Sequence, residues 1–166
     1  YAIVGRKSRG ISNDLKSLQG KKFGAPAPDA AYQQWPIFKA VNKIDDKDMK
    51  FENVGFPVRE PMLAQGEVDA VFGFSISSVI TVKARGVPAD DIVQILMADY
   101  GVELYGNGVM VNGKFAQENP EVVRKMLRAI NRSIKEAIKN PAAAVDAVLK
   151  RNDVARREVE MERFVM

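Results

Sequence analysis

The chain has 166 residues, 46% hydrophobic and 28% charged, a balance that is typical of a folded domain and excludes a disordered tail or a fibre. It contains no cysteine and no histidine, which excludes disulfides, thiolate nucleophiles, thiolate zinc sites and imidazole chemistry within this chain. Lysine and arginine exceed the acidic residues by 25 to 21, and this net charge of +4 favours anionic ligands without requiring them.

Short apolar runs alternate with helical periodicity in the first part of the chain. Residues 1–4 and 22–25 are predicted strands. The segment 30–44 has helical periodicity, and Pro36 within it predicts a kink or break near Trp35, because proline disrupts a helix interior.

The run 68–74 is the most strand-like segment, since it is mostly apolar, as a strand covered on both faces would be. Strands that alternate with helices of about 10 residues are typical of a parallel sheet whose crossovers are helical. The sequence therefore predicts an α/β fold over residues 1–112, with a doubly wound, mostly parallel sheet. Further strands are predicted at 51–56, 92–97 and 108–112, and helices at 59–65 and 75–84.

After Asn112 the pattern changes to consecutive helices, predicted at 120–139, 142–150 and 154–165. Basic residues on the polar side of the first helix are interpreted as a solvated face, because no base-stacking aromatic residues are interleaved with them. No nucleic-acid partner is therefore predicted. The opposite side of this helix is an apolar stripe that something must cover, and it consists of Val123, Met126, Leu127, Ile130, Ile134, Ala137 and Ile138.

Three turns follow predicted strand ends, where open α/β sheets bind ligands. The first joins a strand to a helix amino end, and free N–H groups there attract anions. It lacks the lysine of a phosphate-binding loop, and an ordinary turn without a ligand is the alternative. The candidate contacts in this turn are Pro26, Ala27, Pro28, Asp29 and Ala30.

The other two turns combine aromatic and polar side chains, which suits a small organic ligand. In the second turn the alternative is that Ser75 only caps its own helix. No catalytic residue, cofactor or metal site is predicted, since the acidic residues of 45–48 lack the spacing of a calcium loop. The candidate ligand contacts are Phe74, Ser75 and Ser77 in the second turn, and Asp99, Tyr100, Tyr105 and Asn107 around the third. Tyr32 is a further candidate, whose ring would line the ligand site.

Three segments, in this order, resemble a known family: DLKSLQGKKFG at 14–24, GEVDAVFG at 66–73 and NPEVV at 119–123. Together they resemble the periplasmic solute-binding proteins of ABC importers for nitrate, sulfonates, taurine and thiamine-pyrimidine precursors. The resemblance implies a type II fold, in which two hinge strands join two α/β lobes around a solute. It also implies a small-molecule solute and a membrane permease as partners, and a periplasmic or extracellular location at the membrane.

The same resemblance implies a division of the chain, with most of the first lobe preceding Tyr1. If that lobe is absent, the apolar stripe stays uncovered, and we expect self-association of the chain or a non-native docking of this helix onto the second lobe. The implied parts are a hinge strand and linker at 1–11, the second lobe at 12–106, a returning hinge strand at 107–112 and helices of the first lobe at 113–166.

The family's ligand loop corresponds to 26–31, and its second contact to Phe74 and Ser75. Proline and alanine stand where sulfonate and nitrate binders often have glycine and serine, and Phe-Ser stands where many have Trp-Asp. The resemblance therefore favours a flat organic molecule over an inorganic anion.

A non-catalytic carrier is the function that the resemblance implies first, so the protein is predicted not to be an enzyme. One alternative is an enzyme of the same fold, similar to the thiamine-pyrimidine precursor synthases, whose catalytic histidine and cysteine would lie outside this chain. Another alternative is the ligand-sensing half of a two-lobed transcription regulator.

Overall fold

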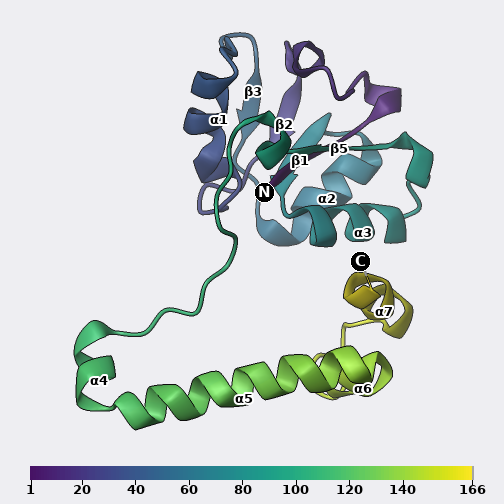
Figure 1. Ribbon diagram of the computed structural model, residues 1–166. Helices are drawn as coiled ribbons and strands as arrows, with labels where there is room; N and C mark the ends of the chain where they lie inside the picture. The colour runs from purple at the N-terminus through teal and green to yellow at the C-terminus, as the bar shows by residue number, and fades with distance from the viewer. Residues whose placement is uncertain (166) are drawn as a thin grey trace. The chain divides into compact units, whose positions relative to one another are not determined.

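A computed structural model describes residues 1–165 and divides the chain into two compact units, with the boundary between Leu104 and Tyr105 (Figure 1). The first unit contains a five-stranded sheet, and the second unit is helical. Within the described residues, no helix is long and apolar enough to cross a bilayer.

The sheet has the strand order β3-β2-β4-β1-β5. Strand β2 pairs in parallel with β3 and β4, whereas β1 pairs antiparallel with both β4 and β5. Four strands thus run in one direction, which confirms the mostly parallel α/β fold, and β1 alone runs against them. The strands are β1 (Ala2–Arg6), β2 (Lys22–Gly24), β3 (Lys50–Glu52), β4 (Ala70–Gly73) and β5 (Ile92–Leu96).

Helices link successive parallel strands and cover both faces of the sheet. Helix α1 (Trp35–Val41) packs Trp35 and Phe38 into the core on one face. Helices α2 (Phe56–Gln65) and α3 (Ser75–Ala84) cover the other face through apolar side chains such as Leu63 and Val82. Short 3-10 helices complete the unit at Lys7–Arg9, Leu15–Leu18, Tyr32–Gln34, Ala89–Asp91 and Met97–Tyr100.

The segment 30–44 changes from a 3-10 turn to the α-helix α1 at Trp35, where a kink or break was predicted. Pro36 lies in the first turn of α1, where its missing N–H has no intrahelical acceptor to lose. Proline here marks where the α-helix begins.

The strand expected at 108–112 is wrong, because residues 102–112 have no regular secondary structure. The first strand, by contrast, lies inside the sheet and pairs on both sides. Hinge roles for 1–11 and 107–112 remain predictions.

The second unit consists of four helices, three of which lie close to the predicted ranges. Helix α5 has the predicted bounds, with Pro120 in its first turn. Asn140 precedes α6, where its side chain accepts a hydrogen bond from the Ala143 N–H. The helices are α4 (Gly113–Glu118), which was not predicted, α5 (Pro120–Lys139), α6 (Pro141–Leu149) and α7 (Arg157–Val165).

An ion pair at the end of β1 makes stability depend on pH. The Asp91 carboxylate accepts hydrogen bonds from the Ser8 backbone N–H at 2.7 Å and from Arg6 Nε at 2.8 Å. These contacts, the Ser8 N–H foremost, lower the pKa of Asp91 from 3.8 to about 2. A carboxyl with a depressed folded-state pKa stabilises the fold above its unfolded value and loses this contribution as the pH falls.

We therefore expect Asp91→Asn to lower the free energy of unfolding by about 1 kcal/mol at pH 7, and the difference from wild type to shrink between about pH 4 and pH 2. Urea unfolding at both ends of this range measures it. The neighbouring exposed Asp90, changed to Asn, is the control and should alter stability at neither pH. A constant Asp91→Asn deficit down to pH 2 would show that the carboxylate charge is not its cause.

Candidate functional site

The strand directions bring the segments that carry most of the predicted site to one edge of the sheet. Strands β2 to β5 all end at this edge, and β1 begins there because it runs the other way, so that Ala2 lies opposite both Gly73 and Leu96. We call this edge the rim. It consists of Tyr1 and the segments 25–34, 53–60, 74–78 and 97–101.

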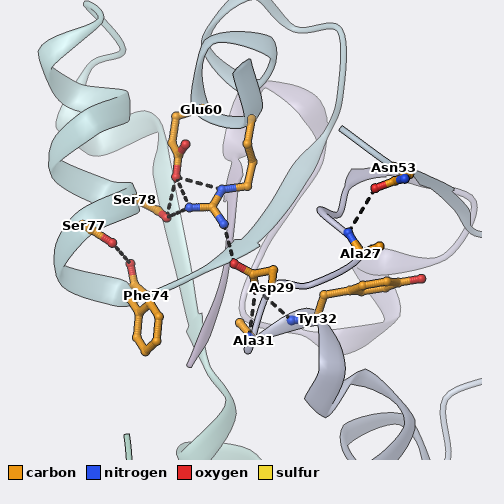
Figure 2. Close-up of polar contacts among 10 residues, drawn as sticks. Ala27, Asp29, Ala31, Tyr32, Asn53, Glu60, Phe74, Ser77 and Ser78 are labelled. Carbon is orange, nitrogen blue, oxygen red and sulfur yellow. Dashed lines mark hydrogen bonds and ion pairs between the residues drawn. The ribbon is translucent and has the colours of Figure 1, made fainter. Parts of the chain in front are cut away.

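The first predicted turn is held by its own carboxylate. Asp29 is 3% exposed, and its Oδ1 accepts hydrogen bonds from the backbone N–H groups of Ala31 at 2.8 Å and Tyr32 at 3.0 Å. The Ala27 N–H donates to Asn53 Oδ1 at 3.0 Å, which ties this turn to the end of β3 (Figure 2). Asp29 thus has a structural role that the sequence did not indicate. Of the other predicted contacts in this turn, Pro26 is buried, Ala30 is half-buried, and Ala27 and Pro28 are exposed.

A buried charged cluster beside this turn was missed by the sequence analysis. Arg59, in α2, donates from Nη1 to Asp29 Oδ2 at 2.7 Å, and from Nε and Nη2 to Glu60 Oε1 at 2.9 and 2.6 Å. Ser78 of α3 donates to the same Glu60 oxygen at 2.8 Å (Figure 2). We call Asp29, Arg59, Glu60 and Ser78 the Arg59 cluster. Adjacent opposite charges in a helix were the only sequence signal for it, and such pairs are usually solvated.

The second turn begins α3 without a side-chain cap. The cap residue is Phe74, which makes no side-chain capping hydrogen bond, and Ser75 is already inside the helix, so the capping role suggested for Ser75 is wrong. Ser75 is the first helical residue and is half-buried, and the Ser77 hydroxyl donates to the Phe74 carbonyl at 3.4 Å. Because an α-helix leaves its first N–H groups without intrahelical acceptors, donors remain at this part of the rim.

Two of the predicted contacts, Phe74 and Tyr32, place aromatic rings at the rim. The Phe74 ring lies 5.4 Å from that of Tyr1, between centroids. The Tyr32 ring lies 5.1 Å from the Phe72 ring, so Tyr32 extends the core aromatic cluster to the rim. Both rings are only partly buried, as a wall for a ligand requires.

The third turn is only partly at the rim. Asp99 is exposed, whereas the Tyr100 hydroxyl donates to the Asn13 carbonyl at 2.7 Å and its ring packs on Phe38. Tyr105 and Asn107 belong to the second unit. Ligand contact by the four residues remains a prediction.

The rim has an unusual charge balance. Its four segments contain one cationic side chain, Arg59, against the three carboxylates of Asp29, Glu60 and Asp99. Since the Arg59 guanidinium is engaged by two of these carboxylates, the rim offers no unpaired cationic side chain. Across the described residues, no group of three or more acidic, cysteine or histidine side chains could hold a metal ion.

Comparison with known proteins places the chain in a family. The family model described as NMT1/THI5 like matches residues 1–144. Riboflavin-binding protein RibY of Chloroflexus aurantiacus is 26% identical over 138 residues, which cover 82% of this chain and 38% of RibY. A 4-amino-5-hydroxymethyl-2-methylpyrimidine phosphate synthase of Aspergillus parasiticus is 29% identical over 153 residues, 87% of this chain and 44% of the synthase.

A solved structure has the same fold. The periplasmic sulfonate-binding protein SsuA of Methylobacillus flagellatus KT superposes with a TM-score of 0.57 at 19% identity, over 98% of this chain and 48% of that protein. The chain thus spans less than half the length of each of these three proteins.

These findings correct one prediction and confirm another. The prediction that the protein is not an enzyme is overturned, because a synthase is among the relatives that match most of the chain. The resemblance to the ABC-importer solute-binding proteins is confirmed by the family match and by the shared fold. The chain belongs to the NMT1/THI5-like family and has the α/β fold of the periplasmic solute-binding proteins.

Proposed function

We propose that the rim is one side of a binding site for a small, flat organic solute, in a two-lobed protein that encloses the solute between its lobes. The observation that carries this proposal is the charge of the rim, where the only cationic side chain, Arg59, is paired with two carboxylates. Aromatic rings lie there beside the start of α3, which has no side-chain cap.

The charge balance disfavours an inorganic anion. Nitrate or a sulfonate would meet the carboxylates of Asp29, Glu60 and Asp99, and the four rim segments contain no arginine or lysine side chain besides the paired Arg59 to offset them. The uncapped first turn of α3 can still donate to a neutral carbonyl or ring nitrogen. A neutral heteroaromatic molecule satisfies both conditions.

As for the whole protein, we propose a carrier that delivers this solute to a membrane permease of an ABC importer, from the periplasm or cell exterior. The support is the family membership and the shared fold with a periplasmic sulfonate-binding protein.

A second candidate is supported by the synthase relative, 29% identical to this chain. Under this proposal the rim holds the pyrimidine part of a substrate or product. Because the chain contains no histidine or cysteine, any imidazole or thiol group in the reaction would come from outside it. An assay of the full-length protein for pyrimidine phosphate formation separates this candidate from the carrier.

Titration calorimetry tests the proposed solute class directly, with riboflavin and 4-amino-5-hydroxymethyl-2-methylpyrimidine compared against taurine and nitrate. We expect at least one heteroaromatic solute to bind, and Phe74→Ala to weaken that binding about tenfold, because stacking on the ring is lost. The control is Ile37→Ala, an exposed residue of α1 outside the rim. Tighter binding of taurine or nitrate than of both heteroaromatic solutes would contradict the proposal.

We further propose that the isolated chain self-associates through the second unit. A groove of about 450 Å³ there is lined by apolar residues, among them Met110 at 94% and Met126 at 61% exposure. Exposed apolar area of this kind favours association with a second copy. We expect sedimentation to show dimers or larger species, which Met126→Lys converts to monomer and Lys125→Gln does not; a monomeric wild type would contradict this.

A further inference from the structure

The Arg59 cluster joins three parts of the rim that are far apart in sequence. Asp29 belongs to the turn after β2, Arg59 and Glu60 belong to α2, and Ser78 is the fourth residue of α3. All four residues are at most 7% exposed. Figure 2 shows the side chains of Asp29, Glu60 and Ser78 converging from separate elements.

The guanidinium geometry makes these contacts simultaneous. One edge of Arg59, Nη1, donates to Asp29, while Nε and Nη2 donate to Glu60. A planar fork can serve two carboxylates in different directions, whereas a lysine ammonium is a single point charge on a flexible stem. Arg59 therefore fixes the distance between the turn after β2 and helix α2.

The Arg59 cluster also holds backbone and helix positions next to the aromatic residues of the rim. The Asp29 carboxylate that accepts from Arg59 also accepts the N–H groups of Ala31 and Tyr32, so the position of the Tyr32 backbone depends on Arg59. On the other side, Glu60 accepts from Ser78, one turn beyond the uncapped start of α3. The same cluster thus places the Tyr32 ring and the α3 amino end.

We propose that Arg59 is a positioning residue for solute binding: it does not contact the solute, and it holds the turn after β2 and the amino end of α3 at the separation that the solute requires. This inference rests on the proposed function. This role differs from that of an arginine that binds an anionic ligand, because the N–H groups of the Arg59 guanidinium donate to the carboxylates of Asp29 and Glu60.

The test uses two variants of the cluster and one matched control. Arg59→Lys keeps the positive charge but removes the planar guanidinium group that donates to both carboxylates. Asp29→Asn keeps an oxygen that can accept from the Ala31 and Tyr32 N–H groups, but it replaces the oxygen that accepts from Arg59 with an NH2 group. This second variant tests the inference if Arg59→Lys does not fold. The control, Arg6→Lys, makes the same change at the opposite edge of the sheet, where the Arg6 guanidinium donates to Asp91 and to the Ala64 carbonyl.

Two readouts are measured on each protein: the affinity for riboflavin and for 4-amino-5-hydroxymethyl-2-methylpyrimidine, and the amide exchange rates of Ala31 and Tyr32. The Lys16 amide, which donates to Asp14 in a similar turn, reports general loosening. We expect both cluster variants to weaken binding by about tenfold or more and to speed exchange at Ala31 and Tyr32, while Lys16 is unchanged and Arg6→Lys affects neither readout.

Wild-type affinity in Arg59→Lys or Asp29→Asn overturns the inference, as does an equal loss in Arg6→Lys, which would indicate general destabilisation. If the wild type binds neither solute, the proposed function fails by itself, and the exchange rates then decide whether Arg59 holds the turn: unchanged exchange at Ala31 and Tyr32 overturns that role, and selective acceleration supports it.

Discussion

Gly73→Ala is expected to lower the free energy of unfolding by about 2–3 kcal/mol, although it adds only one methyl group. A Cβ at this position would lie 2.2 Å from Ser78 Oγ and 3.3 Å from Arg59 Nη2. Gly73 cannot move away easily, because it pairs with Ala2 in the middle of the sheet. The Ser78 hydroxyl can rotate only by giving up its hydrogen bond to Glu60.

Urea unfolding of Gly73→Ala, of Ser78→Ala and of the double variant measures this effect as a cycle. Removing the Ser78 hydroxyl also removes the closest contact, so the two changes should cost less together than the sum of their separate costs. Gly108→Ala is the control, since a Cβ there meets nothing within 4 Å. Full additivity, or a Gly73→Ala cost no larger than that of the control, would contradict the packing of this cluster.

Phe72→Ala has the largest expected effect on stability, about 3–5 kcal/mol. Phe72 is fully buried in β4, and its ring centroid lies 5.7 Å from that of Phe23 and 5.6 Å from that of Trp35. The neighbouring strands are held by backbone pairing on both sides of β4, so the core cannot collapse to fill the space. Because Tyr32 also packs on Phe72, the variant should weaken solute binding as well.

Chemical denaturation of Phe72→Ala against Phe56→Ala tests this expectation. Phe56 is 48% exposed, and its ring centroid lies 5.6 Å from the Arg59 guanidinium, so its removal should cost at most about 1 kcal/mol. Similar costs for the two variants would show that Phe72 is not the centre of the core.

The elements with strong local signals were predictable. Helix α5 has a proline in its first turn and an apolar stripe along its length, and it forms over the predicted residues. Strand β4 is apolar at every position, and it lies where a strand covered on both faces was expected. Pro36 marked the position of the change in helix type at Trp35, because proline is tolerated in the first turn of an α-helix and not in its interior.

The features that depend on distant partners were not predictable. Nothing within residues 2–6 specifies that β1 runs antiparallel between β4 and β5. The apolar run at 108–112 has the composition of a strand but no partner strand, so it forms none. The burial of Arg59 and Glu60 depends on Asp29, thirty positions away from Arg59, and local periodicity carries no such information.

The most direct test of the proposed binding rim is an NMR titration of the chain with riboflavin, 4-amino-5-hydroxymethyl-2-methylpyrimidine, taurine and nitrate. We expect saturable amide shifts with a heteroaromatic solute, concentrated at residues 27–32 and 74–77, and none with the two anions. Saturable shifts confined to the apolar groove at 109–130, or no saturable shift with any of the four solutes, would contradict the proposal.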